Sequence, residues 1–310
     1  MNDLEQSILK TLAFFDLFCY PLTSWEIFKW LYQPTKQSTY NEVLTGLLDL
    51  KNSGRLEELN GFYFLPGQKN HITKRSLNYS LAQIKYRRAK RFVRVLKNFP
   101  WIKAILVCNT LAYNNAGESS DIDLLIVATP GRLWLTRLLV LGLLKLLGCR
   151  PKINNKKDAI DVAFFVADNH FDFSSLTLEN NGVIDDPDFA YWLEKFVPLY
   201  GEQNLIEKIA LANPWLKDIL PNAYGVRPPE ARFEQKDQAL RQVKNWEITN
   251  YLEAAAKALQ LKIMPLELKQ AINQSSNVSV TDNWLKFHLH DPREKYRTLW
   301  QERLKDLNLL

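Results

Sequence analysis

The segment A-I-L-V-C-N-T-L-A-Y-N-N-A-G-E-S-S-D-I-D-L-L-I-V-A, residues 104–128, decides the fold of this chain. Two short apolar runs, 104–107 and 122–127, flank a polar stretch that contains Asn, Gly and Ser. Apolar runs of this length between turn-forming residues predict two buried strands of a covered sheet. We therefore expect an α/β fold organised around this pair of strands.

Two carboxylates, Asp121 and Asp123, stand at the start of the second predicted strand. The two-residue period of a strand places both on one face, while Ile122 between them points into the core. Neighbouring carboxylates repel each other, and each favours its protonated form unless a cation is supplied. Hard divalent ions such as Mg²⁺ prefer such oxygen ligands, so the pair predicts a metal site. The alternative is that Asp121 closes a turn and Asp123 is simply exposed.

The same segment resembles the signature of the DNA polymerase beta-like nucleotidyltransferase superfamily. That signature is a hydrophobic strand, a Gly-Gly or Gly-Ser turn, a spacer, and then Asp-apolar-Asp on the next strand. Here Asn109 and Thr110 occupy the position of the turn, and residues 111–120 form the spacer. Within the superfamily, the chain resembles bacterial proteins that join a winged-helix segment to this domain.

The resemblance implies an enzyme that moves a nucleoside monophosphate from a nucleoside triphosphate to an acceptor hydroxyl. The third acid of the superfamily lies on a later strand, and Asp161 fills that position within the apolar run 159–166. The resemblance thus implies that Asp121, Asp123 and Asp161 are catalytic and bind Mg²⁺ or Mn²⁺. The acceptor stays open between a nucleic acid, a protein hydroxyl and a small molecule such as an antibiotic.

The predicted nucleotide-binding turn departs from the superfamily pattern at Asn109. The resemblance implies that Asn109, Thr110 and Ser120 contact the nucleotide. Glycine suits this turn because it has no side chain and tolerates positive φ, and Asn is among the few other residues that adopt the left-handed region. The departure also supports an alternative function: a catalytically inactive fold that acts as a nucleic-acid-binding or regulatory module.

The resemblance and the hydrophobic patterns together predict an α/β (α+β) nucleotidyltransferase domain with a mixed sheet, flanked by a winged-helix domain and a helical C-terminal region. Helical patterns over residues 4–18, 24–32 and 40–52 precede Asn60-Gly61, a strong hairpin signal. Three helices and a hairpin are the order of a winged-helix domain, which binds nucleic acid or packs on protein. The predicted regions are 1–68 (winged helix), 69–99 (basic connecting helix), 100–200 (catalytic domain) and 201–310 (helical C-terminal region).

The positive charge of the chain is concentrated in one predicted helix. Residues 68–98 contain ten Lys and Arg residues and no acid, while the whole chain has a net charge of +6. The predicted inner stripe consists of Leu81, Ile84, Phe92, Val95, Leu96 and Phe99. The predicted outer face, which suits the phosphates of RNA or DNA, consists of Lys85, Arg87, Arg88, Arg91 and Arg94. Tyr79 and Tyr86 are expected to stack on bases, and the alternative is a solvated linker helix.

The composition is typical of a globular protein of about two domains in a reducing compartment. Hydrophobic residues make up 46% of the 310 residues, and the three cysteines are far apart, without the spacing of a zinc site. The polar start M-N-D-L-E-Q is not that of a secretory signal, so we expect a cytoplasmic protein. Residues 133–148 are apolar but shorter than the roughly 20 residues of a membrane-spanning helix. We expect them to form a buried helix between the two acid-bearing strands.

The C-terminal half contains two predicted helix starts and a predicted linker. Asp186-Pro187 predicts a capped helix with proline in its first turn. Asp291-Pro292-Arg293-Glu294 predicts a capping box, which explains these residues better than a metal site with His288 and His290. Pro221, Pro228 and Pro229 predict a linker over residues 221–230.

Overall fold

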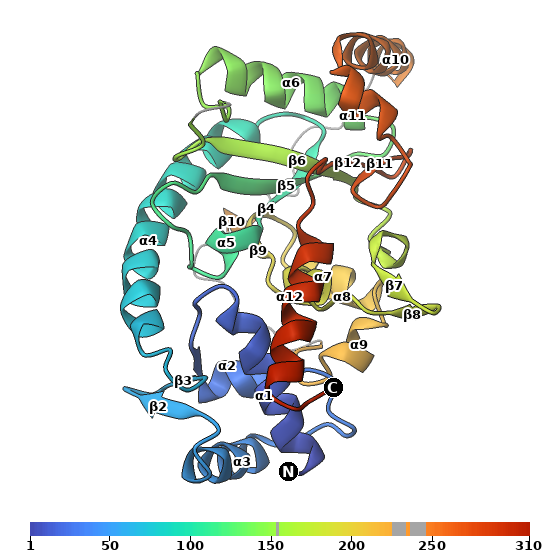
Figure 1. Cartoon of the computed structure of the whole chain (residues 1–310). Coiled ribbons are helices and arrows are strands. Elements are labelled where there is room, and N and C mark those ends of the chain that lie inside the picture. The colour runs from blue at the N-terminus through green and yellow to red at the C-terminus, as the bar shows by residue number, and fades with distance from the viewer. Residues whose placement is uncertain (153–154, 225–233, 236–245) are drawn as a thin grey trace.

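The computed structural model of the chain describes residues 1–152, 155–224, 234–235 and 246–310 (Figure 1). Within these ranges the protein is a mixed α/β structure with one large central sheet and helices on both of its faces. Most of the predicted proline-rich linker, residues 225–230, lies outside the described residues.

The central sheet is mixed, with the strand order β10-β9-β4-β5-β6-β12-β11. Its strands are β4 (Ile102–Val107), β5 (Ile122–Ala128), β6 (Ile160–Ala167), β9 (Val197–Gly201), β10 (Glu234–Gln235), β11 (Val278–Val280) and β12 (Trp284–Phe287). The two apolar runs of the opening segment form β4 and β5, as predicted. β5 is antiparallel to β4 and parallel to β6, so the two acid-bearing strands are neighbours that run in the same direction.

Both faces of the central sheet are apolar, and each contributes to a separate core. Leu106 and Leu125 belong to one core, whereas Ile105 and Ile126 belong to the other. This alternation follows from the two-residue period of strands that are covered on both sides. The helices over the second core are α4 (Asn70–Leu96), α5 (Asn109–Ala112), α6 (Leu133–Leu146) and α10 (Trp246–Ile263).

The first core continues from the sheet into the N-terminal helices. Its helices are α1 (Asp3–Asp16), α2 (Ser24–Lys29), α3 (Tyr40–Asn52), α7 (Pro187–Glu194), α8 (Leu205–Leu211), α9 (Leu216–Ile219) and α12 (Arg293–Asp306). Tyr191 of α7 and Trp300 of α12 both pack on the ring of Phe14 in α1. The N-terminal helices therefore share their hydrophobic core with elements from the second half of the chain.

The N-terminal segment has the predicted three helices followed by a hairpin. The hairpin strands are β2 (Glu57–Leu59) and β3 (Phe62–Phe64), and β1 (Leu22–Thr23) pairs with β3. Asn60 and Gly61 at the turn have φ values of 55° and 79°, the left-handed conformation that such a two-residue turn requires. Thr23 caps α2 and bonds reciprocally with Glu26.

The basic helix α4 forms as predicted, and Phe92 and Leu96 of the predicted inner stripe are buried, but the rest of the buried face differs from the prediction. Ile84 and Val95, predicted inside, are 54% and 45% exposed. The buried face instead contains Ala82, Lys85, Tyr86 and Ala89. The small alanines allow the helix backbone to approach the sheet, which selects this face over the one with more large apolar residues.

Two predictions for α4 are therefore wrong. Lys85, assigned to the basic outer face, is only 2% exposed and has its own partners inside the protein. Tyr86 is also buried and cannot stack on bases, whereas Tyr79 is exposed. Arg87, Arg88, Arg91 and Arg94 are exposed, as expected for the outer face.

The region after residue 200 is not wholly helical, contrary to the prediction. The polar segment that precedes Trp284 contains β11, which pairs with β12, and β12 pairs with β6. Val278, Trp284 and Leu285 are buried there, and Trp284 and Leu285 pair with residues of β6 that are distant in sequence. The remaining short elements are α11 (Leu266–Gln270), β7 (Glu179–Asn180) and β8 (Val183–Ile184).

The two predicted helix starts in this half have different outcomes. Asp186 caps α7 and Pro187 is in its first turn, as predicted. The capping box at residues 291–294 is wrong, because Pro292 is the N-cap of α12 and no side chain caps the helix. The carboxylate of Asp291 instead forms ion pairs with Lys286 and Arg293.

The apolar helix α6 connects β5 to β6, as predicted. It has 14 residues, and Arg137 on it donates a hydrogen bond to Gln260 of α10. Among the described residues, no helix is both long enough and apolar enough to cross a membrane.

Candidate metal centre

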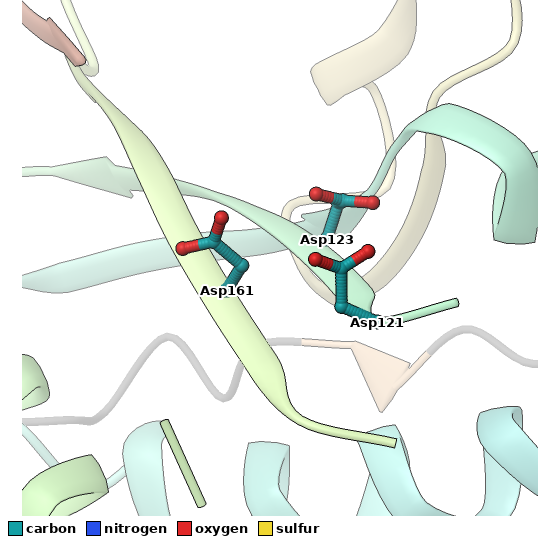
Figure 2. Close-up of side chains that lie close together, drawn as sticks. All are labelled: Asp121, Asp123 and Asp161. Carbon is teal, nitrogen blue, oxygen red and sulfur yellow. The ribbon is translucent and has the colours of Figure 1, made fainter. Parts of the chain in front are cut away.

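The three predicted acids lie at the start of two neighbouring strands. Asp121 directly precedes β5, and Asp123 and Asp161 are the second residues of β5 and β6. Because β5 and β6 are parallel and pair in register here, Asp123 lies opposite Asp161. The intervening Ile122 is fully buried, so the aspartates occupy the opposite face of the strand. Figure 2 shows the three side chains close together.

The carboxylates of Asp121, Asp123 and Asp161 form a compact group. One oxygen atom from each lies within 4.8 Å of the others, and all three side chains are half-buried. Two oxygens on opposite sides of one Mg²⁺ ion are about 4 Å apart, since each Mg–O bond is about 2.0–2.1 Å. Small side-chain rotations are therefore sufficient for the group to coordinate one divalent ion, or two ions that share a carboxylate.

The electrostatics of the group favour a cation. Burial, followed by the charges of Asp121 and Asp161, raises the pKa of Asp123 to about 8. Burial and the charge of Asp121 also raise the pKa of Asp161. A divalent cation would offset the repulsion that raises both values.

The donors at this centre are hard oxygen ligands. Cys108 is buried beside the acids, and burial together with the charges of Asp123 and Asp161 raises the pKa of its thiol. The thiol is therefore neutral at physiological pH and is a poor metal ligand. Three carboxylates without a thiolate or imidazole suit Mg²⁺ or Mn²⁺ better than Zn²⁺.

Asn109 holds the turn next to the acids in the left-handed conformation. Its φ is 54°, so asparagine adopts a positive φ in this turn, as expected. The side-chain carbonyl of Asn109 accepts a 2.8 Å hydrogen bond from the indole N–H of Trp192. Its amide is then the group that donates to Asp123, and this hydrogen bond lowers the pKa of the carboxyl against the effect of burial.

The other two predicted nucleotide-binding residues are placed differently. Thr110 is exposed in the first turn of α5, next to Asn109. The hydroxyl of Ser120 donates a 2.7 Å hydrogen bond to the carbonyl of Gly117, within the loop that precedes β5. The Ser120 side chain thus stabilises this loop in the present structure.

Further residues that were not predicted from sequence affect the acids, among them Trp192, Lys156 and Arg150, whose charge lowers the pKa of Asp161. Trp192 fixes Asn109 from α7, and the charge of Lys156 lowers the pKa of Asp123 and Asp161. Lys156 is close to Asp161 in sequence and could have been proposed from that proximity. Trp192 lies 83 residues after Asn109, and no local sequence pattern connects the two residues.

The structure thus brings Asp121, Asp123, Asp161 and Asn109 together, and leaves the predicted arginines on the outer face of α4. Comparisons with protein-family models, curated proteins and solved structures found no match for this chain.

Divalent ions are expected to stabilise the protein more strongly near pH 8 than near pH 6. In the ion-free protein, Asp123 holds its proton up to about pH 8, whereas in the unfolded chain it releases it near pH 4. The folded state binds more protons in this window, so stability falls as the pH rises. A divalent ion competes with that proton and restores stability where the carboxyl is ionised.

Thermal unfolding with and without millimolar MgCl₂ checks this expectation. We expect a rise in Tm of a few degrees near pH 8 and a smaller rise near pH 6, since ~1 kcal/mol moves the Tm of large domains by about 2–4 °C. KCl at matched ionic strength is the control for screening. An equal effect of both salts would contradict a metal site.

Proposed function

We propose that the protein is a metal-dependent nucleotidyltransferase. The observation that carries this proposal is the convergence of three carboxylates from two parallel neighbouring strands, beside a left-handed turn at the end of β4. This order of a strand, a turn, an Asp-Ile-Asp strand and a third acid is the one that the sequence resemblance implies. The N-terminal helices and the sheet β1-β3-β2 support a winged-helix segment joined to this domain.

The proposed roles follow from the positions of the side chains. Asp121 and Asp123 hold Mg²⁺ or Mn²⁺, and Asp161 on the adjacent strand completes the ligand set on the acceptor side. The bound ions supply charge neutralisation for the triphosphate and the departing pyrophosphate. Asn109 orients the Asp123 carboxylate, and the exposed Thr110 hydroxyl is available to a phosphate oxygen. The acceptor oxygen attacks the α-phosphorus, and the bond from that phosphorus to pyrophosphate breaks.

Two measurements test the proposed activity. Incubation of the protein and a cell lysate with each labelled nucleoside triphosphate and Mg²⁺ should transfer label to an acceptor, which can then be identified. Calorimetric titration with a non-hydrolysable triphosphate and Mg²⁺ should show saturable binding. No binding at millimolar nucleotide would reject the enzyme and favour an inactive module.

The exposed face of α4 favours a second candidate function, the binding of nucleic acid. Arg87, Arg88, Arg91 and Arg94 are exposed, and none is paired with a carboxylate in the described part of the chain. Unpaired guanidinium groups along one helix suit the phosphates of RNA or DNA, because each neutralised phosphate releases counterions. This role is compatible with either an active or an inactive nucleotidyltransferase fold.

The double variant Arg87→Ala/Arg91→Ala is expected to weaken nucleic-acid binding at all sequences. The slope of log K against log salt should fall in magnitude by about 1.4–1.8, since each lost phosphate contact contributes about 0.7–0.9. Fluorescence anisotropy over a salt series measures this slope. The matched control is Lys295→Ala/Lys305→Ala, which removes two exposed positive charges from α12. Equal losses in both variants would indicate a general charge effect without a binding face on α4.

A further inference from the structure

Lys85 is a buried cation on α4, the helix on which Arg87, Arg88, Arg91 and Arg94 are exposed. It is 2% exposed, and it occupies the buried face of α4 together with Ala82 and Ala89. A buried ammonium group requires partners, because its removal from water is costly. The partners of Lys85 lie next to the metal centre, so the side chain connects α4 to that centre.

The ammonium group of Lys85 contacts both segments that lead into the acid-bearing strands. It donates to the carbonyl of Ser120 at 2.7 Å and to the carboxylate of Asp158 at 2.6 Å. Ser120 directly precedes Asp121, and Asp158 lies three residues before Asp161. One side chain therefore joins the starts of β5 and β6.

The two segments are also bonded to each other at this point. The backbone N–H of Asp158 donates to the same Ser120 carbonyl at 3.1 Å, and the N–H of Ile122 donates to the carbonyl of Ala159 at 2.8 Å. Asp158 has a φ of 58°, a left-handed conformation that aspartate adopts more readily than most residues with a side chain. The ion pair with Lys85 therefore adds a side-chain link to the backbone hydrogen bonds that join the two loops.

We propose that Lys85 is a positioning residue for the metal centre, which sets the distance between Asp121 and Asp161 by joining the loops that precede them. This inference rests on the proposed function, because it assumes that the three acids bind a divalent ion. Lys85 contacts no substrate and no metal ligand side chain. It acts through Ser120 and Asp158, in the way that outer hydrogen-bond partners orient metal ligands.

Calorimetric titration of the full chain with Mn²⁺ tests the proposal. Lys85→Met keeps the length of the side chain and removes the ammonium group. We expect the Kd for Mn²⁺ to rise by about 10–100-fold, the usual effect of losing an outer partner of a metal ligand. A purely structural role would reduce the folded fraction, and therefore the measured stoichiometry, without raising the Kd of the molecules that remain folded.

Two further variants make the result specific. Asp158→Asn is the second variant, for use if Lys85→Met fails to fold. The Asp158 side chain is 30% exposed, so we expect its substitution to be tolerated by the fold. This variant should also raise the Kd for Mn²⁺ about tenfold. Lys286→Met is the matched control: Lys286 is equally buried and also bonds a carbonyl and a carboxylate, but those belong to Ser276 and Asp291. We expect this control to keep the wild-type Kd.

The Mn²⁺ titrations distinguish a failure of the positioning role from a failure of the proposed metal centre. Tight Mn²⁺ binding by the wild type, with unchanged Kd in folded Lys85→Met and Asp158→Asn, would overturn the positioning role alone. An equal rise in Kd for Lys286→Met would also overturn it. Absence of Mn²⁺ binding by the wild-type protein would overturn the metal centre, and the positioning role with it.

Discussion

Asp123→Asn is expected to abolish divalent-dependent nucleotide transfer, with a loss of about 10³-fold. Asparagine keeps the size of the side chain but removes the negative charge that faces Asp161 across the two strands. The metal then loses a charged ligand, and the stabilisation of charge on the triphosphate is lost with it. Transfer of labelled nucleotide to the acceptor, measured at saturating Mg²⁺, gives the rate ratio. Asp121→Asn should have an effect of the same order.

The stability of this variant distinguishes lost chemistry from lost structure. Repulsion and burial raise the pKa of Asp123 to about 8, so its charged form destabilises the ion-free protein. Asp123→Asn should therefore unfold at a higher temperature than the ion-free wild type near pH 8, while losing activity. Asp282→Asn, at an exposed position far along the chain, is the control and should keep both properties. Persistent transfer by purified Asp123→Asn would refute the assigned role.

Local sequence signals were sufficient for the elements that carry the acids. The Asp-Ile-Asp pattern placed Asp121 and Asp123 on one face of a strand because the period of a strand depends on its own residues alone. The turn Asn60-Gly61 was predicted for the same reason. Such signals depend on a few consecutive residues, and tertiary contacts do not change the local structure that they predict here.

The features that were not predicted from the sequence depend on packing between distant parts of the chain. Lys85 is buried because its partners Ser120 and Asp158 come from loops that are distant in the chain, as the separations of 35 and 73 residues show. The sequence of α4 is compatible with either of two buried faces, and packing against the sheet determines which face is buried. The strand β11 is short and lies within a polar segment, and it is attached to the central sheet only through β12, which pairs with the distant strand β6.

Arg293→Met is expected to lower the free energy of unfolding by about 3–5 kcal/mol, the usual effect of removing one partner of a buried ion pair. Arg293 is 5% exposed at the start of α12, and Asp186, its partner at 2.8 Å, is 1% exposed. The guanidinium also bonds Asp291 and the carbonyl of Leu176, so it joins α12, α7 and the segment before β7. Methionine fills most of the volume, but it leaves the Asp186 carboxylate without Arg293 and the Asp291 carboxylate with Lys286 alone.

The pKa values indicate why these carboxylates depend on Arg293. Burial alone would raise the pKa of Asp291, but Lys286 and Arg293 hold it at about 2. Burial raises the pKa of Asp186 even with Arg293 present, so loss of the cation would raise it further. In the unfolded chain both carboxylates are solvated and keep their ordinary pKa values. The higher pKa values in the folded variant therefore lower the free energy of unfolding at neutral pH.

Urea unfolding of Arg293→Met measures the loss, and Arg297→Met one turn further along α12 is the matched control. Arg297 is 24% exposed in its side chain and lies 3.8 Å from Asp185, so its pair is partly solvated and should contribute less than about 1 kcal/mol. Both variants remove one arginine from the same helix, so helix propensity and net charge change equally. If their unfolding midpoints fell by the same amount, the stabilising role of the buried network would be rejected. A much larger fall for Arg293→Met would show that the buried ion pair with Asp186 holds α12 to the start of α7.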